Sequence, residues 1–124
     1  MEENPVRWFE IYVQDMGRAR AFYEAVLGVS LSPLGSPALD DMWAFPGGPG
    51  RSGASGALVK MAGVPSGGNS TLVYFGCADC ALEAGRVAAA GGQVMRQKFP
   101  IGQYGYIALA TDTEGNLFGL HSLT

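Results

Sequence analysis

The fold is decided by residues 8–28, which read WFEIYVQDMGRARAFYEAVLG. The stretch opens with apolar side chains at every second position, from Phe9 to Val13, which is the period of a half-buried strand. Asp15 follows as a helix N-cap, because its carboxylate can accept from the free backbone N–H groups of the next turn. Apolar residues then recur at helical spacing until Gly28, where a left-handed residue would end the helix. The stretch therefore predicts a strand followed by an amphipathic helix.

The same pattern returns in residues 72–92, which read LVYFGCADCALEAGRVAAAGG. At a constant offset of 64 residues, Asp15 aligns with Asp79 and Gly28 with Gly92. A repeat of this length is best explained by duplication of one structural unit. The alternative is two unrelated strand–helix units that share generic caps.

Strand-like segments complete each half, so each half is predicted to be β-α-β-β-β and the fold class α+β. We predict these strands at residues 29–34, 41–45 and 57–61 and at residues 93–99, 104–110 and 117–122. Residues 62–70 are rich in Gly, Ser and Pro and are predicted to be a linker. The chain is thus expected to be a single domain, 1–124, with module 1 at about 5–61 and module 2 at about 71–124.

Composition narrows the classes of partner. The 124 residues carry a net charge of −3 and no Lys/Arg cluster, which argues against a nucleic acid or an anionic membrane as partner. The N-terminus lacks an apolar signal core, and no stretch approaches the roughly 18 apolar residues of a membrane span. We therefore expect a soluble, cytoplasmic protein. Cys77 and Cys80 form a lone C-x-x-C, which is either a redox pair, half of a zinc site, or simply one thiol on the buried face of a strand and one in the first turn of a helix.

Two segments resemble a known family. VQDMGRARAFYEAVLG (13–28) and DTEGNLFGL (112–120) are similar to the helix and final turn of the vicinal oxygen chelate superfamily, which includes glyoxalase I, bleomycin-resistance proteins and extradiol dioxygenases. The F-E-I opening is most similar to its short single-domain glyoxalase-like members. The resemblance implies two tandem βαβββ modules forming an open barrel with a central cavity. It also implies a homodimer.

Metal-dependent members of this superfamily hold a divalent ion with one ligand from each of four strands. The corresponding positions here are Trp8, Lys60, Leu72 and Gly119. An indole, a leucine and a glycine offer no donor lone pair, and a protonated lysine repels a cation. We therefore expect a metal-free protein with no cofactor.

A relocated divalent metal site is the alternative. Glu10 and His121 each lie two residues beyond a lost ligand position, with the same strand parity, so both would face the cavity. Two protein ligands would bind a metal weakly. Otherwise Glu10 is a pocket acid balanced by Lys60 or Arg7, and His121 is a surface histidine near the chain end.

Function follows from the cavity-facing side chains. The main hypothesis is a glyoxalase/bleomycin-resistance-like protein that binds a small, partly aromatic organic molecule. The alternative is a lyase, isomerase or dioxygenase-type enzyme that uses Glu10 as catalytic base or as metal ligand, and a third is an interaction module whose cavity is collapsed. The predicted ligand-binding residues are Trp8, Tyr12, Trp43, Lys60, Leu72, Tyr74, Tyr106, Gly119 and His121.

Overall fold

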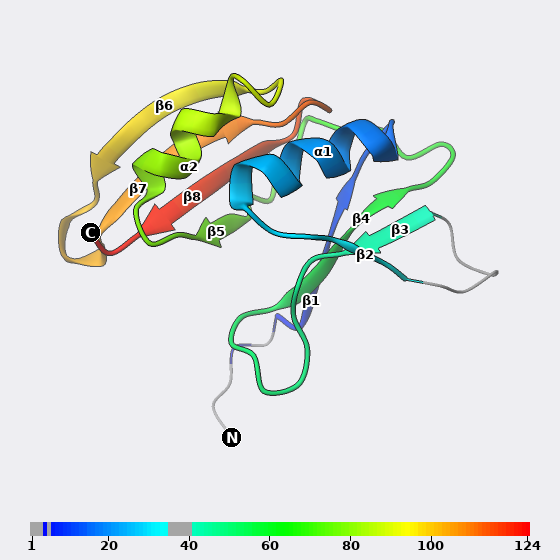
Figure 1. Cartoon of the computed structure of the whole chain (residues 1–124), viewed down its shortest axis with the longest axis horizontal. Coiled ribbons are helices and arrows are strands. Elements are labelled where there is room, and N and C mark those ends of the chain that lie inside the picture. Colours follow the sequence, from blue (N-terminus) through cyan, green and yellow to red (C-terminus); the bar gives the residue numbers. More distant parts are fainter. Residues whose placement is uncertain (1–3, 5, 35–40) are drawn as a thin grey trace.

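The computed structural model describes residues 4, 6–34 and 41–124, and it contains two βαβββ modules in tandem (Figure 1). The first module comprises β1 (Trp8–Tyr12), α1 (Met16–Leu27), β2 (Ser32–Pro33), β3 (Asp41–Ala44) and β4 (Ser55–Lys60). The second comprises β5 (Tyr74–Gly76), α2 (Cys80–Val87), β6 (Gln93–Pro100), the 3-10 turn η1 (Gly102–Tyr104), β7 (Tyr106–Thr111) and β8 (Leu117–Ser122). The predicted α+β class and the order of elements are confirmed.

Each module forms its own four-stranded sheet, with strand orders β1-β4-β3-β2 and β5-β8-β7-β6. The first strand of each module runs parallel to the last, and the other pairs are antiparallel. No strand pair joins the two sheets within the described part of the chain, so the barrel is not closed. β1 and β5 are therefore edge strands, and the two helices lie side by side on one face of the sheets (Figure 1).

The caps of α1 are those that the sequence predicts. Asp15 accepts a hydrogen bond from the backbone N–H of Arg18 (3.0 Å), and Gly28 adopts the left-handed conformation with φ 66°. Asp79 caps α2 through the N–H of Ala81 (3.0 Å). α2 ends at Val87, before the Gly91–Gly92 pair where the sequence predicts its end. A turn follows in which the N–H of Gly92 donates to the Val87 carbonyl at 2.9 Å, and Gly92 lies against the Phe22 ring.

Three predicted strands differ from the structure. The segment 29–34 forms a strand only at Ser32–Pro33, and the N–H of Leu34 adds one further bond to the Met42 carbonyl at 3.0 Å. The segment 104–110 begins instead as the turn η1, and β7 starts at Tyr106 after Gly105 turns the chain with φ 101°. In the second module, the first strand pairs over only three residues, 74–76.

The core lies between the helices and the sheets and is built around aromatic rings from both modules. Tyr23 of α1 has ring centroids of Phe45, Phe75 and Phe118 within 5.6–5.8 Å. Tyr23 and Phe118 are almost fully buried, whereas Phe45 and Phe75 are half-buried. Rings packed edge-on or tilted at this spacing add to the stabilisation from their buried area.

The turn that joins β7 to β8 fastens the second module to the start of α1. Glu114 accepts from the backbone N–H groups of Gln14 (2.9 Å) and Asp15 (3.0 Å). The same carboxylate makes a two-pronged ion pair with Arg18, with N–O distances of 2.7 and 2.8 Å. These hydrogen bonds, led by those from Arg18, lower the pKa of Glu114 from 4.5 to about 2.

Asp112, in the same turn between β7 and β8, is buried and accepts hydrogen bonds from both modules. The Tyr23 hydroxyl donates to its carboxylate at 2.7 Å, and backbone N–H groups of Glu114 and Asn116 donate to its other oxygen at 2.8 Å. The Asn116 amide in turn donates to the Tyr12 carbonyl (3.0 Å) at the end of β1. The D-T-E-G-N segment therefore holds the modules together through side chains, where no strand pairing does.

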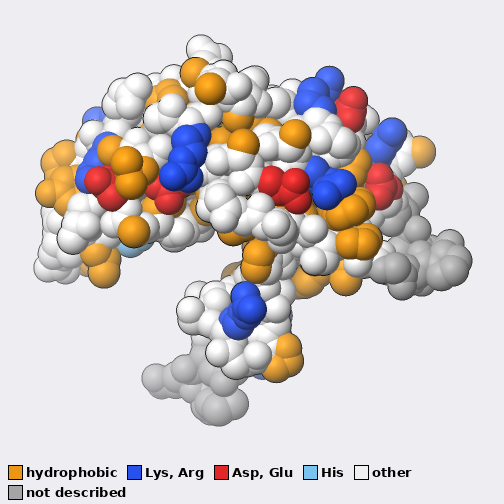
Figure 2. All heavy atoms as spheres, in the orientation of Figure 1, with side chains coloured by type: hydrophobic (Ala, Val, Ile, Leu, Met, Phe, Trp, Pro, Cys, Tyr) orange, Lys and Arg blue, Asp and Glu red, His pale blue; other side chains and the backbone are white. Residues whose placement is uncertain are grey.

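Charged side chains are interspersed over the helical face. Lys/Arg and Asp/Glu groups alternate there with no large area of one sign (Figure 2). This distribution is consistent with the absence of a basic cluster in the sequence. None of the described helices combines the length and the apolar character needed to cross a membrane.

Candidate functional site

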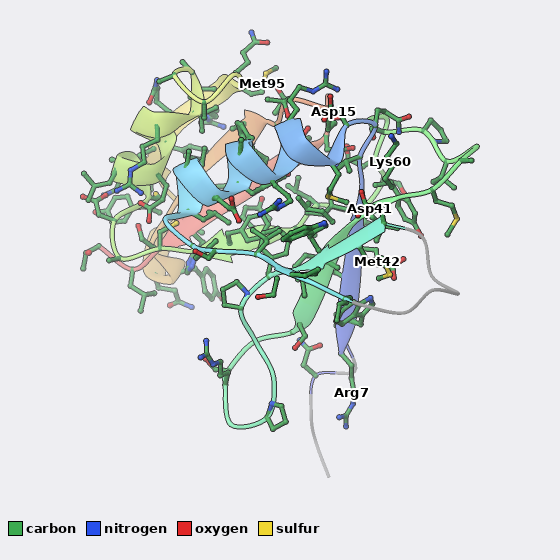
Figure 3. All side chains as sticks on the ribbon, turned by 45° about the vertical axis from the view of Figure 1, so that its right-hand side comes forward. Arg7, Asp15, Asp41, Met42, Lys60 and Met95 are labelled. Carbon is green, nitrogen blue, oxygen red and sulfur yellow. The ribbon has the colours of Figure 1, made fainter. Side chains whose placement is uncertain are left out.

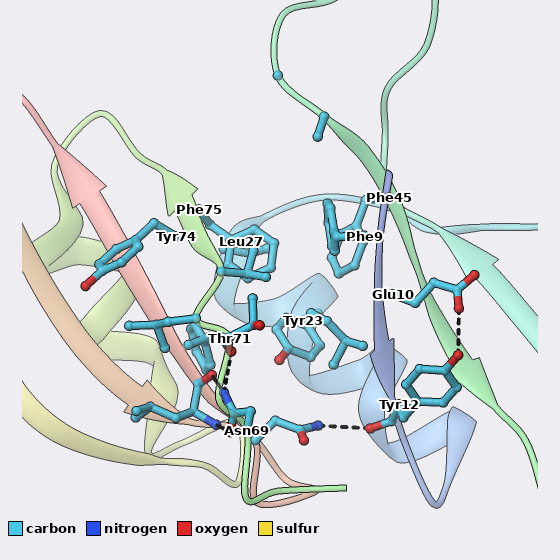
Figure 4. Close-up of a pocket in the computed structure, with 18 of the residues that line it drawn as sticks. Phe9, Glu10, Tyr12, Tyr23, Leu27, Phe45, Asn69, Thr71, Tyr74 and Phe75 are labelled. Atoms are coloured by element: carbon cyan, nitrogen blue, oxygen red, sulfur yellow. Dashed lines mark hydrogen bonds between the residues drawn. The ribbon is translucent and has the colours of Figure 1, made fainter. Parts of the chain in front are cut away.

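A cavity of about 890 Å³ opens between the edge strands β1 and β5 (Figure 4). Its inner wall is formed by aromatic and aliphatic side chains from both modules, with α1 behind them. We call this space the seam pocket. In the space-filling view the molecule is hollowed between the sheet of module 2 and the projecting start of β1 (Figure 2). The residues that form the inner wall are Phe9, Tyr23, Leu27, Phe45, Phe75 and Phe118.

The rim of the pocket on β1 carries three side chains that alternation places on one face. Trp8 donates its indole N–H to one oxygen of Glu10 at 3.0 Å, and the Tyr12 hydroxyl donates to the other at 2.7 Å. Figure 4 shows Glu10 and Tyr12 on the opposite side of β1 from the Phe9 ring. Glu10 is thus held in one orientation by its neighbours two residues before and after it, and the pocket lining includes all three.

The opposite rim, formed by β5 and the residues just before it, is apolar. Leu72 and Tyr74 line the pocket there, and the Tyr74 ring lies across Gly119, its partner on β8. A Cβ at position 119 would overlap that ring. The glycine is therefore required by the ring position, and the ring covers the place from which a glutamate at position 119 would project.

The structure brings five predicted residues together at the seam pocket, namely Trp8, Glu10, Tyr12, Leu72 and Tyr74. Trp43 lies elsewhere: its ring sits under the Arg20 guanidinium of α1 at 3.3 Å and packs against the core. Tyr106 also packs against the core, with the Lys98 ammonium 4.7 Å from its ring centre.

Lys60 and His121 likewise lie outside the pocket lining. Lys60 ends β4 opposite Asp41, at the other end of the β1–β4 pair from Arg7 (Figure 3). His121 Nε2 is 2.7 Å from the Tyr104 carbonyl, so this nitrogen carries the proton and donates it. The hydrogen bonds of Glu10 come from Trp8 and Tyr12, rather than from a lysine or histidine.

Sequence reasoning missed part of the site. Phe9, Phe45 and Phe75 belong to the core-facing parity of their strands, but the gap between the two edge strands exposes their rings to the pocket. Glu83, in the first turn of α2, also reaches the lining, and its Oε1 is buried without a hydrogen-bond partner among the described atoms. Alternation along a strand shows which face a residue occupies, but it does not show where a sheet ends.

Cys77 lies near this carboxylate, at the end of β5. Burial, and then the neighbouring Glu83, raise the pKa of the Cys77 thiol from 9.0 to about 12, so the thiol stays protonated at neutral pH. Its sulfur lies 3.6 Å from the Phe75 carbonyl, to which it donates. Cys80 is the first residue of α2 and is fully buried. Both cysteines are free thiols, and Cys77 is half-buried.

The residues at the family's metal positions do not fit a divalent ion. Trp8 uses its N–H on Glu10, Leu72 is apolar, and the Tyr74 ring covers Gly119. Over the described ranges, no three His, Cys, Asp or Glu side chains gather in a way that could hold a metal. We therefore derive no chemical step through a metal at this site.

Two βαβββ modules with a pocket at their seam define the vicinal oxygen chelate fold. A family model described as bleomycin resistance protein-like N-terminal matches residues 6–36. A protein named provisionally as a glyoxylase, CFP32 of Mycobacterium tuberculosis (strain CDC 1551 / Oshkosh), is 32% identical over 119 residues. By these matches and by its fold, the chain resembles the glyoxalase/bleomycin resistance proteins of the vicinal oxygen chelate superfamily.

That similarity covers 96% of this chain but only 44% of the mycobacterial protein, so the chain spans less than half the length of its curated relative. TnmS3, an antibiotic binding protein from Streptomyces sp. CB03234, is 22% identical with a TM-score of 0.70, covering 100% of this chain and 99% of that one. Glyoxalase I from Zea mays is 24% identical with a TM-score of 0.73, covering 94% and 45%. These two structures show the shared fold.

Proposed function

We propose that the chain binds a small, partly aromatic organic molecule in the seam pocket without requiring a metal. The observation that carries the proposal is the pocket itself: about 890 Å³, walled by aromatic and aliphatic side chains, with few polar groups at its rim. Ligand pockets usually measure about 300–1,000 Å³ and have this mixture of surfaces. Exposed rings at the rim, with Trp8 at 43% and Tyr74 at 47% exposure, offer area that a ligand would bury.

One structural neighbour supports a binding role. The antibiotic binding protein TnmS3 has the same fold over its whole length, although an identity of 22% does not carry its ligand over to this chain. The family also includes glyoxalases, so an enzyme that uses Glu10 as base remains the alternative. Both Glu10 oxygens already accept hydrogen bonds, so a substrate proton would have to share an oxygen with Trp8 or Tyr12.

The test compares substitutions at two glycines that both have open space where a side chain would project. Gly76 lines the pocket and Gly85 lies on α2 outside it, and a Cβ at either position meets no atom within 4 Å. Gly76→Leu should narrow the pocket and weaken binding, whereas Gly85→Leu should leave binding unchanged. A library of aromatic compounds would be screened by thermal shift, and hits measured by calorimetry. A ligand at 100 times its Kd stabilises the fold by about 2.7 kcal/mol, which is readily seen in such a screen.

Failure of the whole library to shift the melting temperature would count against the proposal, as would equal binding by both variants. The enzyme alternative is tested separately. Glu10→Gln keeps an acceptor for one hydrogen bond but removes the base, so it should abolish any turnover that depends on Glu10.

We also propose that the chain forms a homodimer, as the family resemblance implies. The exposed rings of Trp8 and Tyr74 support a second copy covering that face, since apolar surface of this kind is often buried in an interface. Light scattering on purified protein would measure the mass directly. A mass of one chain at micromolar concentration would contradict the dimer and would leave the seam pocket as described.

A further inference from the structure

The seam pocket carries acidic groups that no basic side chain in its lining offsets. Two of its described lining residues are acids, Glu10 and Glu83, and none is Lys or Arg. Everything else in the lining is apolar or neutral. A cavity of low polarity with one sign of charge selects for ligands of the opposite sign.

Glu83 gives the strongest evidence, because one of its oxygens is buried and has no partner. Among the described atoms, Oε1 of Glu83 accepts no hydrogen bond. Arg86, one turn further along α2, donates to the Val26 carbonyl at 3.1 Å. The Cys77 thiol donates to the Phe75 carbonyl and also lies within reach of the Glu83 carboxylate, but it leaves Oε1 without a hydrogen bond. A buried carboxylate oxygen without a donor is unfavourable, so its position in the wall of a pocket points to a donor on the ligand.

Glu10 adds a second acceptor at the rim. Each of its oxygens accepts one hydrogen bond, from Trp8 or Tyr12, and each retains capacity for another. The exposed faces of Trp8 and Tyr74 lie on the two rims of the pocket. Aromatic faces beside a carboxylate attract a cation in addition to burying apolar surface.

We infer that the ligand of the seam pocket is an organic cation, an apolar or aromatic body that carries a protonated amine or similar N–H donor for Glu83. This inference rests on the proposed binding function and adds the charge of the ligand to it. A carboxylate or phosphate on the same body would be repelled by both acids. A neutral analogue would bind through burial alone and leave Glu83 Oε1 without a donor.

The test uses three probes with one naphthalene body: 2-naphthylmethylamine, 2-naphthylmethanol and 2-naphthoic acid. Calorimetry at pH 7 should show the amine binding about tenfold more tightly than the alcohol, and the acid most weakly, since charge-assisted hydrogen bonds are roughly twice as strong as neutral ones. Glu83→Gln should weaken the amine about tenfold and leave the alcohol unchanged. Asp41→Asn, an exposed acid outside the pocket, is the control and should change neither.

The possible outcomes distinguish failure of the inferred ligand charge from failure of the proposed small-molecule binding. Equal binding of amine and alcohol would overturn the inference while leaving small-molecule binding intact. A tighter amine that is indifferent to both Glu83→Gln and Glu10→Gln would also overturn it. If no probe and no library compound binds the folded protein, the proposed function fails and the inference fails with it. Circular dichroism establishes that each variant is folded, and Glu10→Gln replaces Glu83→Gln if the latter is not.

Discussion

Replacing Glu114 by Gln should separate the contribution of the inter-module turn from the rest of the fold. The carboxylate accepts two backbone hydrogen bonds and pairs with both prongs of Arg18. The pKa difference between 4.5 and about 2 corresponds to at most roughly 3 kcal/mol of stabilisation. Half of the Arg18 side chain is exposed, so solvent screens the pair, and we expect a loss of about 2 kcal/mol at pH 7.

The sign of the pH dependence follows from the lowered pKa of Glu114. Its stabilisation is complete above about pH 4.5 and is lost as the pH falls through 4.5 toward 2, where the folded-state carboxylate takes up its proton. The Gln variant lacks this titration. The difference in unfolding free energy between wild type and variant should therefore be constant from pH 8 to 6 and shrink steadily from pH 5 to 2.

Urea unfolding, followed by tryptophan fluorescence and circular dichroism at pH 7, 5, 4 and 3, would measure this difference. Glu24→Gln is the control: its ion pair with Arg20 is long (3.5 Å), lies within α1 and is partly exposed, and glutamine keeps an oxygen that can accept from the Leu31 N–H, so the substitution should cost less than about 1 kcal/mol. The reasoning would be refuted by a Glu114→Gln variant within about 0.5 kcal/mol of wild type at pH 7, or by a difference that persists unchanged at pH 3.

Three further predictions concern single contacts. Gly119→Ala should displace the Tyr74 ring and lower the free energy of unfolding by about 1–2 kcal/mol. In a double-mutant cycle, the same substitution made in a Tyr74→Ala background should lower it by almost nothing. Tyr23→Phe should destabilise by about 1–3 kcal/mol in urea unfolding, because the buried Asp112 carboxylate loses a donor; no loss would mean that its other donors suffice. Cys77, with its pKa raised to about 12, should react with iodoacetamide at pH 8 far more slowly in the folded protein than in urea, and equal rates would contradict its protonated state.

The helix α1 could be predicted from the sequence because both of its ends are encoded locally. Asp15 and Gly28 act through the backbone within a few residues, so no tertiary information is needed to place them. The module repeat followed from the same local features. The role of Glu114 could not be foreseen, because its partners lie about 100 residues away along the chain.

The site was only partly predictable. On β1, polar and apolar residues alternate, so the shared face of Trp8 and Glu10 could be read from the pattern. On β3 nearly every residue is apolar, and the pattern does not show that Trp43 faces α1. The sequence places Glu83 in the first turn of a helix, where an acidic side chain is favourable. Only the structure shows that one of its oxygens is buried beside a pocket.

The hydrogen-bonded set of Trp8, Glu10 and Tyr12 has no counterpart in the other half of the duplication. At the offset of 64 residues, the matching positions are Leu72, Tyr74 and Gly76, none of which is ionic or bonded in this way. The frame is close to twofold symmetric, but the two rims of its pocket are chemically different. A molecule bound in the pocket would contact a polar rim on β1 and an apolar rim beside β5. Its two opposite orientations would therefore not be equivalent. The two halves of the repeat thus present different chemistry to the one pocket that they share.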